Sequence, residues 1–438
     1  MLSNEEGCWP DKFIYVVTVG AAAATNLGPL RSAGFARVAG MMILCAAENH
    51  ENPSADDKRN AIDPTSRLRY YAHTIGIPKE MIRVVKGHPD SFGDWMGALN
   101  EAGDWAGKLK IDVVFNMTGG RKSSAFGALL GYRTAEGRVS PTLISVDLFS
   151  PNARLLQLEE GGGFLEVALP VERGIDLNTY LASYGFTERD RLKREEKVKR
   201  MLALGELSIS LFNGATFKGF ANLYKAFGDR SVSKQAVNAL RSGGVAIIRN
   251  LDNHAVELLL RANAKNKLPG FDLGNRVDDE TEAKISDEFA LRFLTGGWLE
   301  TYILHQLEKI RNLLGPIEIV ASMDIGIAGR PRVGSRSLTE FDVLIYGNDR
   351  LDLVEIKSVV SPNGLKHEAI DKLAQYKNQL TGQGGRAWLV APLVDLAPND
   401  PSDMIAHAKS VGIELLMGKE AVKNLVDSVV KSRTAEVR

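Results

Sequence analysis

Short apolar runs alternate with helical-period stretches over the first 165 or so residues, and this alternation constrains the fold more than any other feature of the sequence. Asp94 to Ala106 predicts a helix, because Trp95, Leu99 and Ala102 recur at i, i+4 and i+7. The extended runs are residues 13–19, 36–47, 81–85, 111–115 and 141–149. Strands that alternate with crossover helices are typical of a doubly wound, mostly parallel sheet. We therefore predict an α/β domain over residues 1–165.

The composition indicates a folded protein of a reducing compartment. Hydrophobic residues make up 44% of the chain and charged residues 25%, which excludes a disordered or low-complexity protein. The two cysteines, Cys8 and Cys45, exclude a disulfide scaffold and a CxxC zinc site. No apolar run approaches the ~18 residues of a membrane span, and the first residues are too polar for a secretory signal. We expect a cytoplasmic protein without a membrane segment.

The sequence changes character between about residues 174 and 290, where helix formers and charged side chains replace the β-branched runs. Glu188 to Arg200 carries eleven charges, and pairs such as Glu195 and Lys199 stand four residues apart. That spacing favours a solvated helix face. A nucleic-acid contact is the alternative, which the balance of 54 basic and 54 acidic residues neither supports nor excludes. Residues 263–277 predict a loop, and we assign residues 166–290 to a mainly helical linker.

The remaining residues, 291–438, predict a second α/β domain with a mixed sheet. The expected order is a helix, three antiparallel strands, a helix and a strand, with a final helix from Ala421. Helices are expected at Phe293 to Leu314 and at Leu365 to Leu380. The expected strands are residues 316–327, 339–347, 352–360 and 386–392.

Acidic and basic side chains meet on two neighbouring strands of this second domain, in the pattern Asp-x12-Glu-x-Lys. Glu355 and Lys357 point to one face of their strand because side chains two apart do so. The Gly347-Asn348-Asp349 turn folds the preceding strand back, so that Asp342 comes beside Glu355. Glu300 stands among apolar neighbours on the preceding helix, where it is a third candidate acid. Glu340, two residues before Asp342, is either a further acid or a solvated side chain.

Carboxylates held together in an apolar sheet repel one another, and a hard divalent cation removes that cost. We therefore expect Glu300, Asp342 and Glu355 to bind Mn²⁺ or Mg²⁺. Lys357 would then orient the water that attacks phosphorus. Taken alone, a Glu-x-Lys pair is more often a surface salt bridge, which contributes less than about 1 kcal/mol.

These four residues, in this order and on these elements, resemble the core of the PD-(D/E)xK nucleases. The Pro that precedes the Asp in that family is replaced here by Phe341. The resemblance implies a restriction-endonuclease-like domain that cleaves phosphodiester bonds of DNA, RNA or both, with Glu300, Asp342, Glu355 and Lys357 as its catalytic residues.

Two further groups of side chains have phosphate binding as one interpretation. Lys372 and Gln375 lie on the helix after the Glu-x-Lys strand, where an exposed amphipathic face is an equally good reading. Arg330, Arg332 and Arg336 cluster in a turn, and there we favour contact with a nucleic-acid backbone over solvation.

A glycine-containing loop in the first domain has the features of an anion site. The strand at residues 111–115 runs into Asn116, and then into Thr118, Gly119, Gly120, Arg121 and Lys122, directly before a predicted helix. Glycines let the backbone approach an anion, and the amides of a helix N-terminus point at it. Thr25 and Asn26 follow the first strand and suit contacts to a base or ribose. A helix cap for Thr118 and a plain turn for Asn26 are the alternatives.

The Asn-x-Thr-Gly-Gly-x-Lys pattern after a buried strand resembles the CARF domains, which have a Rossmann-like fold and bind cyclic oligoadenylates in type III CRISPR immunity. A CARF-like domain followed by Asp-x12-Glu-x-Lys is similar to the CRISPR ancillary nucleases that join these two domains. The resemblance implies a homodimer whose paired CARF domains bind a cyclic oligoadenylate, most often cyclic tetra-adenylate. The residues expected near the ring are Thr25, Asn26, Asn116, Thr118, Gly119, Gly120, Arg121 and Lys122.

The resemblance further implies that the cyclic nucleotide allosterically activates a metal-dependent endonuclease in antiviral defence. Two alternatives remain at this stage. One is a protein that senses a cyclic nucleotide and binds nucleic acid without cutting it, and the other is a restriction-type nuclease that needs no activator.

Overall fold

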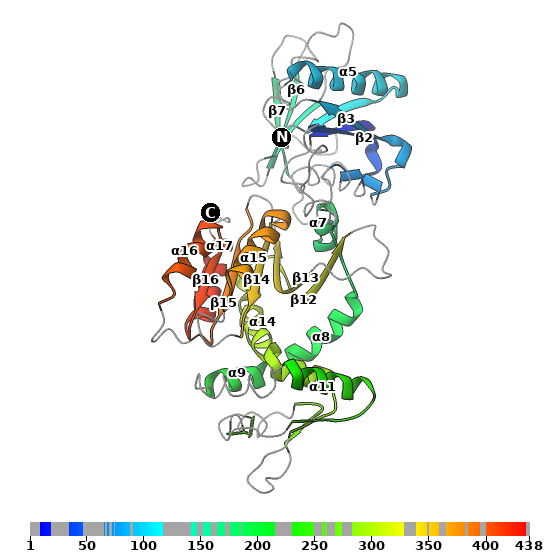
Figure 1. The fold of residues 1–438 in the computed structure, drawn as a ribbon. Helices are drawn as coiled ribbons and strands as arrows, with labels where there is room; N and C mark the ends of the chain where they lie inside the picture. Colours follow the sequence, from blue (N-terminus) through cyan, green and yellow to red (C-terminus); the bar gives the residue numbers. More distant parts are fainter. Residues whose placement is uncertain are drawn as a thin grey trace.

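Seven strands of the N-terminal part form one sheet, in the order β3-β2-β1-β4-β5-β6-β7 (Figure 1). The first five strands pair in parallel, and β6 and β7 add an antiparallel hairpin at one edge. The strands are β1 (Phe13–Thr18), β2 (Val38–Ala46), β3 (Ile82–Gly87), β4 (Asp112–Asn116), β5 (Thr142–Val146), β6 (Asn152–Leu158) and β7 (Phe164–Pro170). This computed structural model confirms the predicted doubly wound α/β fold and adds the β6–β7 hairpin, which the sequence pattern did not indicate.

The structure describes only part of the chain. The described residues are 9–18, 35–46, 65, 68–69, 72–73, 75–87, 91–116, 142–146, 152–158, 164–170, 176–184, 186–214, 230–248, 256–257, 259–260, 268–273, 283–327, 339–347, 350–358, 365–381, 384–394 and 400–434.

Helix α5 (Phe92–Leu109) covers one face of the N-terminal sheet. Ser91 caps its start by accepting a hydrogen bond from the Asp94 amide, and Lys110 ends it in the left-handed conformation. The apolar side of the helix, including Trp95 and Leu99, packs on buried side chains of β1, β2 and β4. The helix predicted from the spacing of Trp95, Leu99 and Ala102 is thus confirmed.

The segment after β7 contributes both helices and strands. Its helices are α7 (Leu177–Ser183), α8 (Arg191–Ala203), α9 (Gly205–Gly214) and α11 (Arg230–Arg241). A small antiparallel sheet has the order β10-β11-β9, from β9 (Ala246–Ile248), β10 (Phe271–Leu273) and β11 (Ala283–Ile285). Strand β10 lies within the stretch predicted as a loop, because its pairing with the distant β11 leaves no local signal. The predicted charged helix is present as α8.

A six-stranded mixed sheet forms the C-terminal domain, in the order β16-β15-β14-β13-β12-β8. Its strands β12 (Glu318–Ile327), β13 (Thr339–Gly347) and β14 (Arg350–Ile356) are antiparallel, as predicted. The predicted strand β15 (Ala387–Ala391) and the further strand β16 (Glu414–Met417) pair in parallel. The edge strand β8 (Phe186–Glu188) comes from the preceding segment and pairs with β12. The helices are α13 (Glu288–Arg292), α14 (Trp298–Ile310), α15 (His367–Leu380), α16 (Ser402–Ser410) and α17 (Ala421–Thr434).

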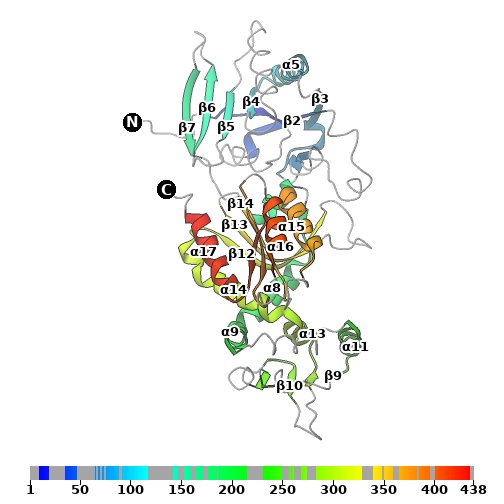
Figure 2. The ribbon, with the colours of Figure 1, turned by 60° about the vertical axis from the view of Figure 1, so that its left-hand side comes forward.

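Helices cover both faces of this sheet (Figure 2). The core under α14 and α17 contains Val343, Val354 and Trp388, and the core under α7 and α15 contains Leu344 and Leu353. Residues that alternate along each strand thus enter opposite cores. Apolar residues on both faces of β14 are therefore buried, as Leu353 and Val354 are.

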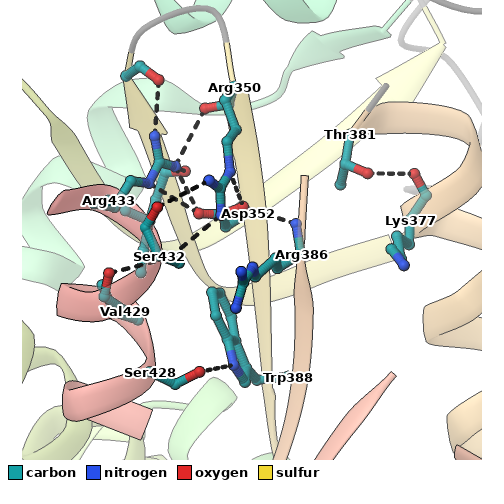
Figure 3. A network of polar contacts seen from close by, with 12 residues as sticks. Arg350, Asp352, Lys377, Thr381, Arg386, Trp388, Ser428, Val429, Ser432 and Arg433 are labelled. Carbon is teal, nitrogen blue, oxygen red and sulfur yellow. Dashed lines mark hydrogen bonds and ion pairs between the residues drawn. The ribbon is translucent and has the colours of Figure 1, made fainter. Parts of the chain in front are cut away.

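A buried ionic network ties the last helix to the β13–β14 hairpin (Figure 3). Asp352 on β14 is fully buried and accepts hydrogen bonds from Arg350 Nε at 2.9 Å, Arg433 Nε at 3.0 Å and the Arg386 amide at 2.7 Å. Arg433 also donates to the carbonyl oxygens of Gly347 and Ile345, at 2.8 Å each. Every charge in this network has a partner of opposite sign, which is the condition for a buried charge to be tolerated.

None of the helices among the described residues has the length and apolar character needed to cross a membrane.

Candidate active site

The β13–β14 hairpin places Asp342 opposite Glu355. Val343 pairs with Val354, so the next step of the same antiparallel register joins Asp342 to Glu355. Directly opposed residues of antiparallel strands lie on the same face, with Cβ atoms about 5 Å apart. The structure therefore brings together the two acids that the Asp-x12-Glu spacing predicted to meet.

An irregularity in β12 lies next to Asp342. The ladder pairs Ala321 with Val343 and Met323 with Phe341, which leaves Ser322 opposite Asp342. Ser322 has φ of 52°, a left-handed conformation that is costly for a residue with a Cβ. Ala321 belongs to the core under α14, whereas Met323 belongs to the core under α15. Residues two apart would normally share a face, so the sheet rotates at this point.

Glu300 reaches the same place from the first turn of α14. A kink within Phe293–Gly297 joins α13 to α14, and Gly296 at this kink has a non-helical φ of 142°. A Cβ at Gly296 would lie 3.2 Å from Ser358 Oγ, just after Lys357. The absence of a side chain at Gly296 therefore lets the start of α14 approach the end of β14.

Hydrogen bonds hold two of the carboxylates. Asp342 Oδ2 accepts a hydrogen bond from the Ile356 amide at 2.6 Å. Glu355 Oε1 forms a short ion pair with Lys357 Nζ, and both side chains are partly exposed. Burial opposes the charge on the Lys357 ammonium, but the attraction of Glu355, Asp342 and Glu300 outweighs it, so the pKa of Lys357 is raised. Lys357 is thus a fixed cation at the end of β14.

The pKa values of two acids record how crowded the charges are. Burial raises the pKa of Asp342 well above its usual range, and the charges of Glu355 and Glu300 raise it further. The pKa of Glu300 is also raised, first by burial and then by Glu340 and Glu355, while Lys197 acts in the opposite direction. Desolvated acids that repel one another are typical of functional sites.

A cavity of about 300 Å³ opens beside these acids. Its wall includes Glu300, Glu340 and Asp342, together with the basic residues Lys197 and Arg292. The polar residues Thr295, Thr301 and Ser358 also belong to the lining. The sequence allowed two interpretations of Glu340, as a further acid of the site or as a solvated side chain. In the structure it is exposed and also lines the cavity.

The donor set suits a hard divalent cation, because carboxylate oxygens are the ligands that Mg²⁺ and Mn²⁺ prefer. The raised pKa values of Glu300 and Asp342 mean that burial and like charges disfavour their ionised forms, which such a cation would stabilise. Within the described part of the chain, no three carboxylate, imidazole or thiol groups already form a metal-binding cluster. In this arrangement Glu355 is bonded to Lys357, and Asp342 to a backbone amide.

The helix α15 contributes a residue that the sequence did not single out. Tyr376 is buried, its hydroxyl is hydrogen-bonded to Thr339, and its pKa is raised by burial and by the nearby charge of Glu355. Lys372 lies one turn earlier, with Nζ 5.8 Å from the Tyr376 ring centre, and is exposed. Gln375 is exposed as well. The apolar spacing of this helix indicates which face is buried, but not that the buried tyrosine ends near Glu355.

The basic turn predicted to contact a nucleic-acid backbone lies outside the described residues; its arginines are Arg330, Arg332 and Arg336.

One candidate residue of the N-terminal loop is described. Asn116 ends β4 and is fully buried, with its side-chain amide donating a hydrogen bond to Tyr15 Oη at 2.8 Å. This bond fixes the point at which β4 passes into the predicted anion-binding loop. The other residues predicted to line the nucleotide site lie outside the described residues: Thr25, Asn26, Thr118, Gly119, Gly120, Arg121 and Lys122.

Comparisons with known proteins bear on both domains. Residues 287–436 match the family model described as Card1-like, endonuclease domain. This match confirms the nuclease resemblance that Asp342, Glu355 and Lys357 indicated, at the level of the domain. The comparison with curated proteins gave no match.

Two solved structures share the fold over nearly the whole chain. One is protein VC1899 from Vibrio cholerae, with a TM-score of 0.64, 17% identity, and coverage of 97% of this chain and 98% of that chain. The other is Can2 from Sulfobacillus thermosulfidooxidans, solved in complex with cyclic tetra-adenylate, with a TM-score of 0.60, 19% identity, and the same coverage. The arrangement of an N-terminal Rossmann-like domain, a connecting segment and a C-terminal nuclease-like domain is therefore a known one.

Proposed function

We propose that this protein is a metal-dependent nuclease of type III CRISPR defence, which cleaves DNA, RNA or both when a cyclic oligoadenylate binds its N-terminal domain. The observation that carries the proposal is the meeting of Glu300, Asp342 and Glu355 beside Lys357, at one end of the sheet in the domain that matches an endonuclease family. Such a protein would act in the cytoplasm as a homodimer.

The chemistry of the site assigns a role to each side chain. Glu300, Asp342 and Glu355 would hold Mn²⁺ or Mg²⁺, which supplies positive charge for the phosphorane-like transition state. Lys357 is fixed by Glu355, so its ammonium is positioned to orient the attacking water and to stabilise negative charge on a phosphate oxygen. Glu355 would have to exchange part of its contact with Lys357 for the cation.

The N-terminal domain supports a role in sensing. Strand β4 ends at Asn116, and after Met117 the chain continues as Thr-Gly-Gly-Arg-Lys. The Can2 structure, which has the same overall fold, holds cyclic tetra-adenylate. We expect cyclic tetra-adenylate to bind in a cleft between two copies of this domain. Thr25, Asn26 and the residues from Asn116 to Lys122 would contact it.

The test is cleavage of single-stranded DNA, supercoiled DNA and RNA by the purified full chain, with Mn²⁺ or Mg²⁺ and with or without cyclic tetra-adenylate. Cleavage that needs both the metal and the activator is the expected result. Cleavage in metal alone would overturn the activation, and no cleavage in any combination would overturn the nuclease assignment for these substrates.

A double variant tests the sensor loop separately. Lys122→Ala with Thr118→Ala should remove activation at moderate concentrations of cyclic tetra-adenylate, because it deletes a cation and a hydroxyl of the proposed anion site. Direct calorimetric binding of cyclic tetra-adenylate provides the measurement, and unchanged affinity would reject the assignment of this loop.

A further inference from the structure

A helix outside the C-terminal domain is fixed against it along one face. Helix α8 precedes that domain by nearly a hundred residues, yet Arg194, Lys197 and Arg200 each form an ion pair with a different element. Arg194 Nε lies 2.5 Å from Glu188 Oε1 of β8, and Arg200 pairs closely with Asp287, the residue that caps α13. Residues three apart are neighbours on a helix surface, so the three basic side chains form one stripe along α8. The ends of this stripe are therefore anchored.

Lys197 occupies the middle of the stripe and enters the proposed active site. Its Nζ lies 2.8 Å from Glu340 Oε1, two residues before Asp342. Lys197 lines the same cavity as Glu300 and Asp342, and its positive charge is the first of those that lower the pKa of Glu300. The side chain is 26% exposed, against 47% for Glu340. Lys197 is thus the more buried partner of this ion pair, and Glu340 is the more exposed one.

The position of Lys197 suits a phosphate group better than a permanent bond to Glu340. An exposed ion pair contributes little to stability, about 0–1 kcal/mol. A phosphodiester that enters the cavity would bring negative charge next to three carboxylates and would need a cation to offset it. Arg292, the other basic residue of the wall, is 59% exposed and paired with Glu288 on its own helix. Lys197 is less exposed than Arg292, and its ion-pair partner Glu340 belongs to the same cavity wall.

We propose that Lys197 is a substrate-binding residue, whose ammonium leaves Glu340 for a phosphate oxygen of the nucleic-acid strand in the cavity. This inference rests on the proposed nuclease function and adds a contact from the segment between the two large domains. The Lys197 side chain is held toward the cavity because ion pairs of Arg194 and Arg200 anchor α8 on both sides of it. Met201, one turn later, also packs in the core under α14.

The experiment compares Lys197→Met with Lys197→Arg and with Lys199→Met, a matched control on the exposed side of α8. Each full-length variant is assayed for cleavage of single-stranded DNA with Mn²⁺ and cyclic tetra-adenylate, after its melting temperature is checked. We expect Lys197→Met to raise KM about tenfold, Lys197→Arg to restore most of the affinity, and Lys199→Met to match the wild type. For Lys197→Met, the slope of the logarithm of the DNA-binding constant against the logarithm of the salt concentration should also become shallower by about 0.7.

Glu340→Gln separates substrate binding from simple charge balance. If Lys197 binds phosphate, Glu340→Gln lowers KM because it frees the lysine, and the double variant Lys197→Met with Glu340→Gln stays as weak as Lys197→Met. If Lys197 only neutralises Glu340, the double variant recovers the wild-type KM, and the proposal is wrong.

A binding arm keeps this test independent of cleavage. Fluorescence anisotropy of labelled single-stranded DNA and RNA, measured in Ca²⁺, reports affinity even if the wild type cuts neither. Weaker binding by Lys197→Met than by Lys199→Met supports the phosphate contact, and equal binding by both overturns it.

Discussion

The two ends of β14 hold acidic side chains in opposite electrostatic situations. Near its start, Asp352 is fully buried and bonded to Arg350, Arg433 and a backbone amide (Figure 3). At its other end, Glu355 lies beside Asp342, whose pKa is raised by burial and by like charges. Both arrangements lie on one strand of the same sheet.

This difference separates a charge that serves the fold from a charge that serves a ligand. The fold itself supplies cations and donors to Asp352, so no external group is needed there. Around Asp342 the acids outnumber the cations that contact them, and Asp342, Glu300 and Glu340 line a cavity open to solvent. Unfavourable charge beside a cavity is stabilised by something that binds from outside.

The largest effect is expected at the end of β14 that carries Glu355. Glu355→Gln or Lys357→Ala should lower the cleavage rate by about 1,000-fold, because each removes charge that acts on the transition state. The loss is measured as the steady-state cleavage rate with Mn²⁺ and cyclic tetra-adenylate. Both variants should bind the activator as tightly as the wild type does. Glu420→Gln, at a side chain that is 71% exposed, is the control. Wild-type rates in both site variants would remove these residues from the mechanism.

The opposite end of β14 should affect stability instead. Asp352→Asn removes the negative charge between Arg350 and Arg433, and leaves two buried cations without a counter-charge. We expect the C-terminal domain to lose about 3 kcal/mol of unfolding free energy. Differential scanning calorimetry measures the loss, and Asp427→Asn on the exposed side of α17 should change the stability by less than about 0.5 kcal/mol. Equal melting curves for the two variants would mean that the network does not stabilise the domain.

Asp342→Asn is expected to act in the reverse sense on stability. The pKa of Asp342 is higher in the folded chain than in the unfolded one, so the folded state binds its proton more tightly and stability falls as pH rises through that interval. Removing the charge should therefore raise the melting temperature at neutral pH by about 2–4 °C. The gain should shrink as the pH is lowered toward the usual range of carboxyl groups. A gain that does not change with pH would have another cause.

The smallest effect is expected at Tyr376. Its hydroxyl is hydrogen-bonded to Thr339, and its pKa is raised by burial and by the nearby charge of Glu355. Tyr376→Phe removes a single neutral hydrogen bond, so cleavage should fall by about threefold. Cleavage kinetics on one substrate provide the measurement. A loss as large as that of Glu355→Gln would place the hydroxyl in direct contact with the reacting groups.

The sequence was most informative where a site depends on local geometry. The spacing of Asp342, Glu355 and Lys357 predicted the hairpin and its facing acids, because a short turn sets the register of antiparallel strands. Glu300 was found because an acid among apolar neighbours is unusual. The parallel N-terminal strands and the C-terminal strands β12 to β15 followed from hydrophobic periodicity, whereas the edge strands β8 and β16 were not predicted.

Contacts between distant segments could not be predicted. Lys197 appeared as one charge on a solvated helix, since nothing in its surroundings in sequence indicates that α8 packs beside β13. Tyr376 and the left-handed Ser322 depend on packing between elements as well. The partners of Asp352 come from β14, the start of β15 and the last helix, which no local pattern connects.

Activity of Asp342→Asn, measured side by side with the wild type on DNA and RNA in Mn²⁺ and cyclic tetra-adenylate, tests the central claim most directly. The account predicts a folded variant, with a melting temperature at or above that of the wild type, that cleaves neither nucleic acid while the wild type cleaves at least one. A variant that cleaves at the wild-type rate would contradict the claim that the acids at this end of the sheet form the active site.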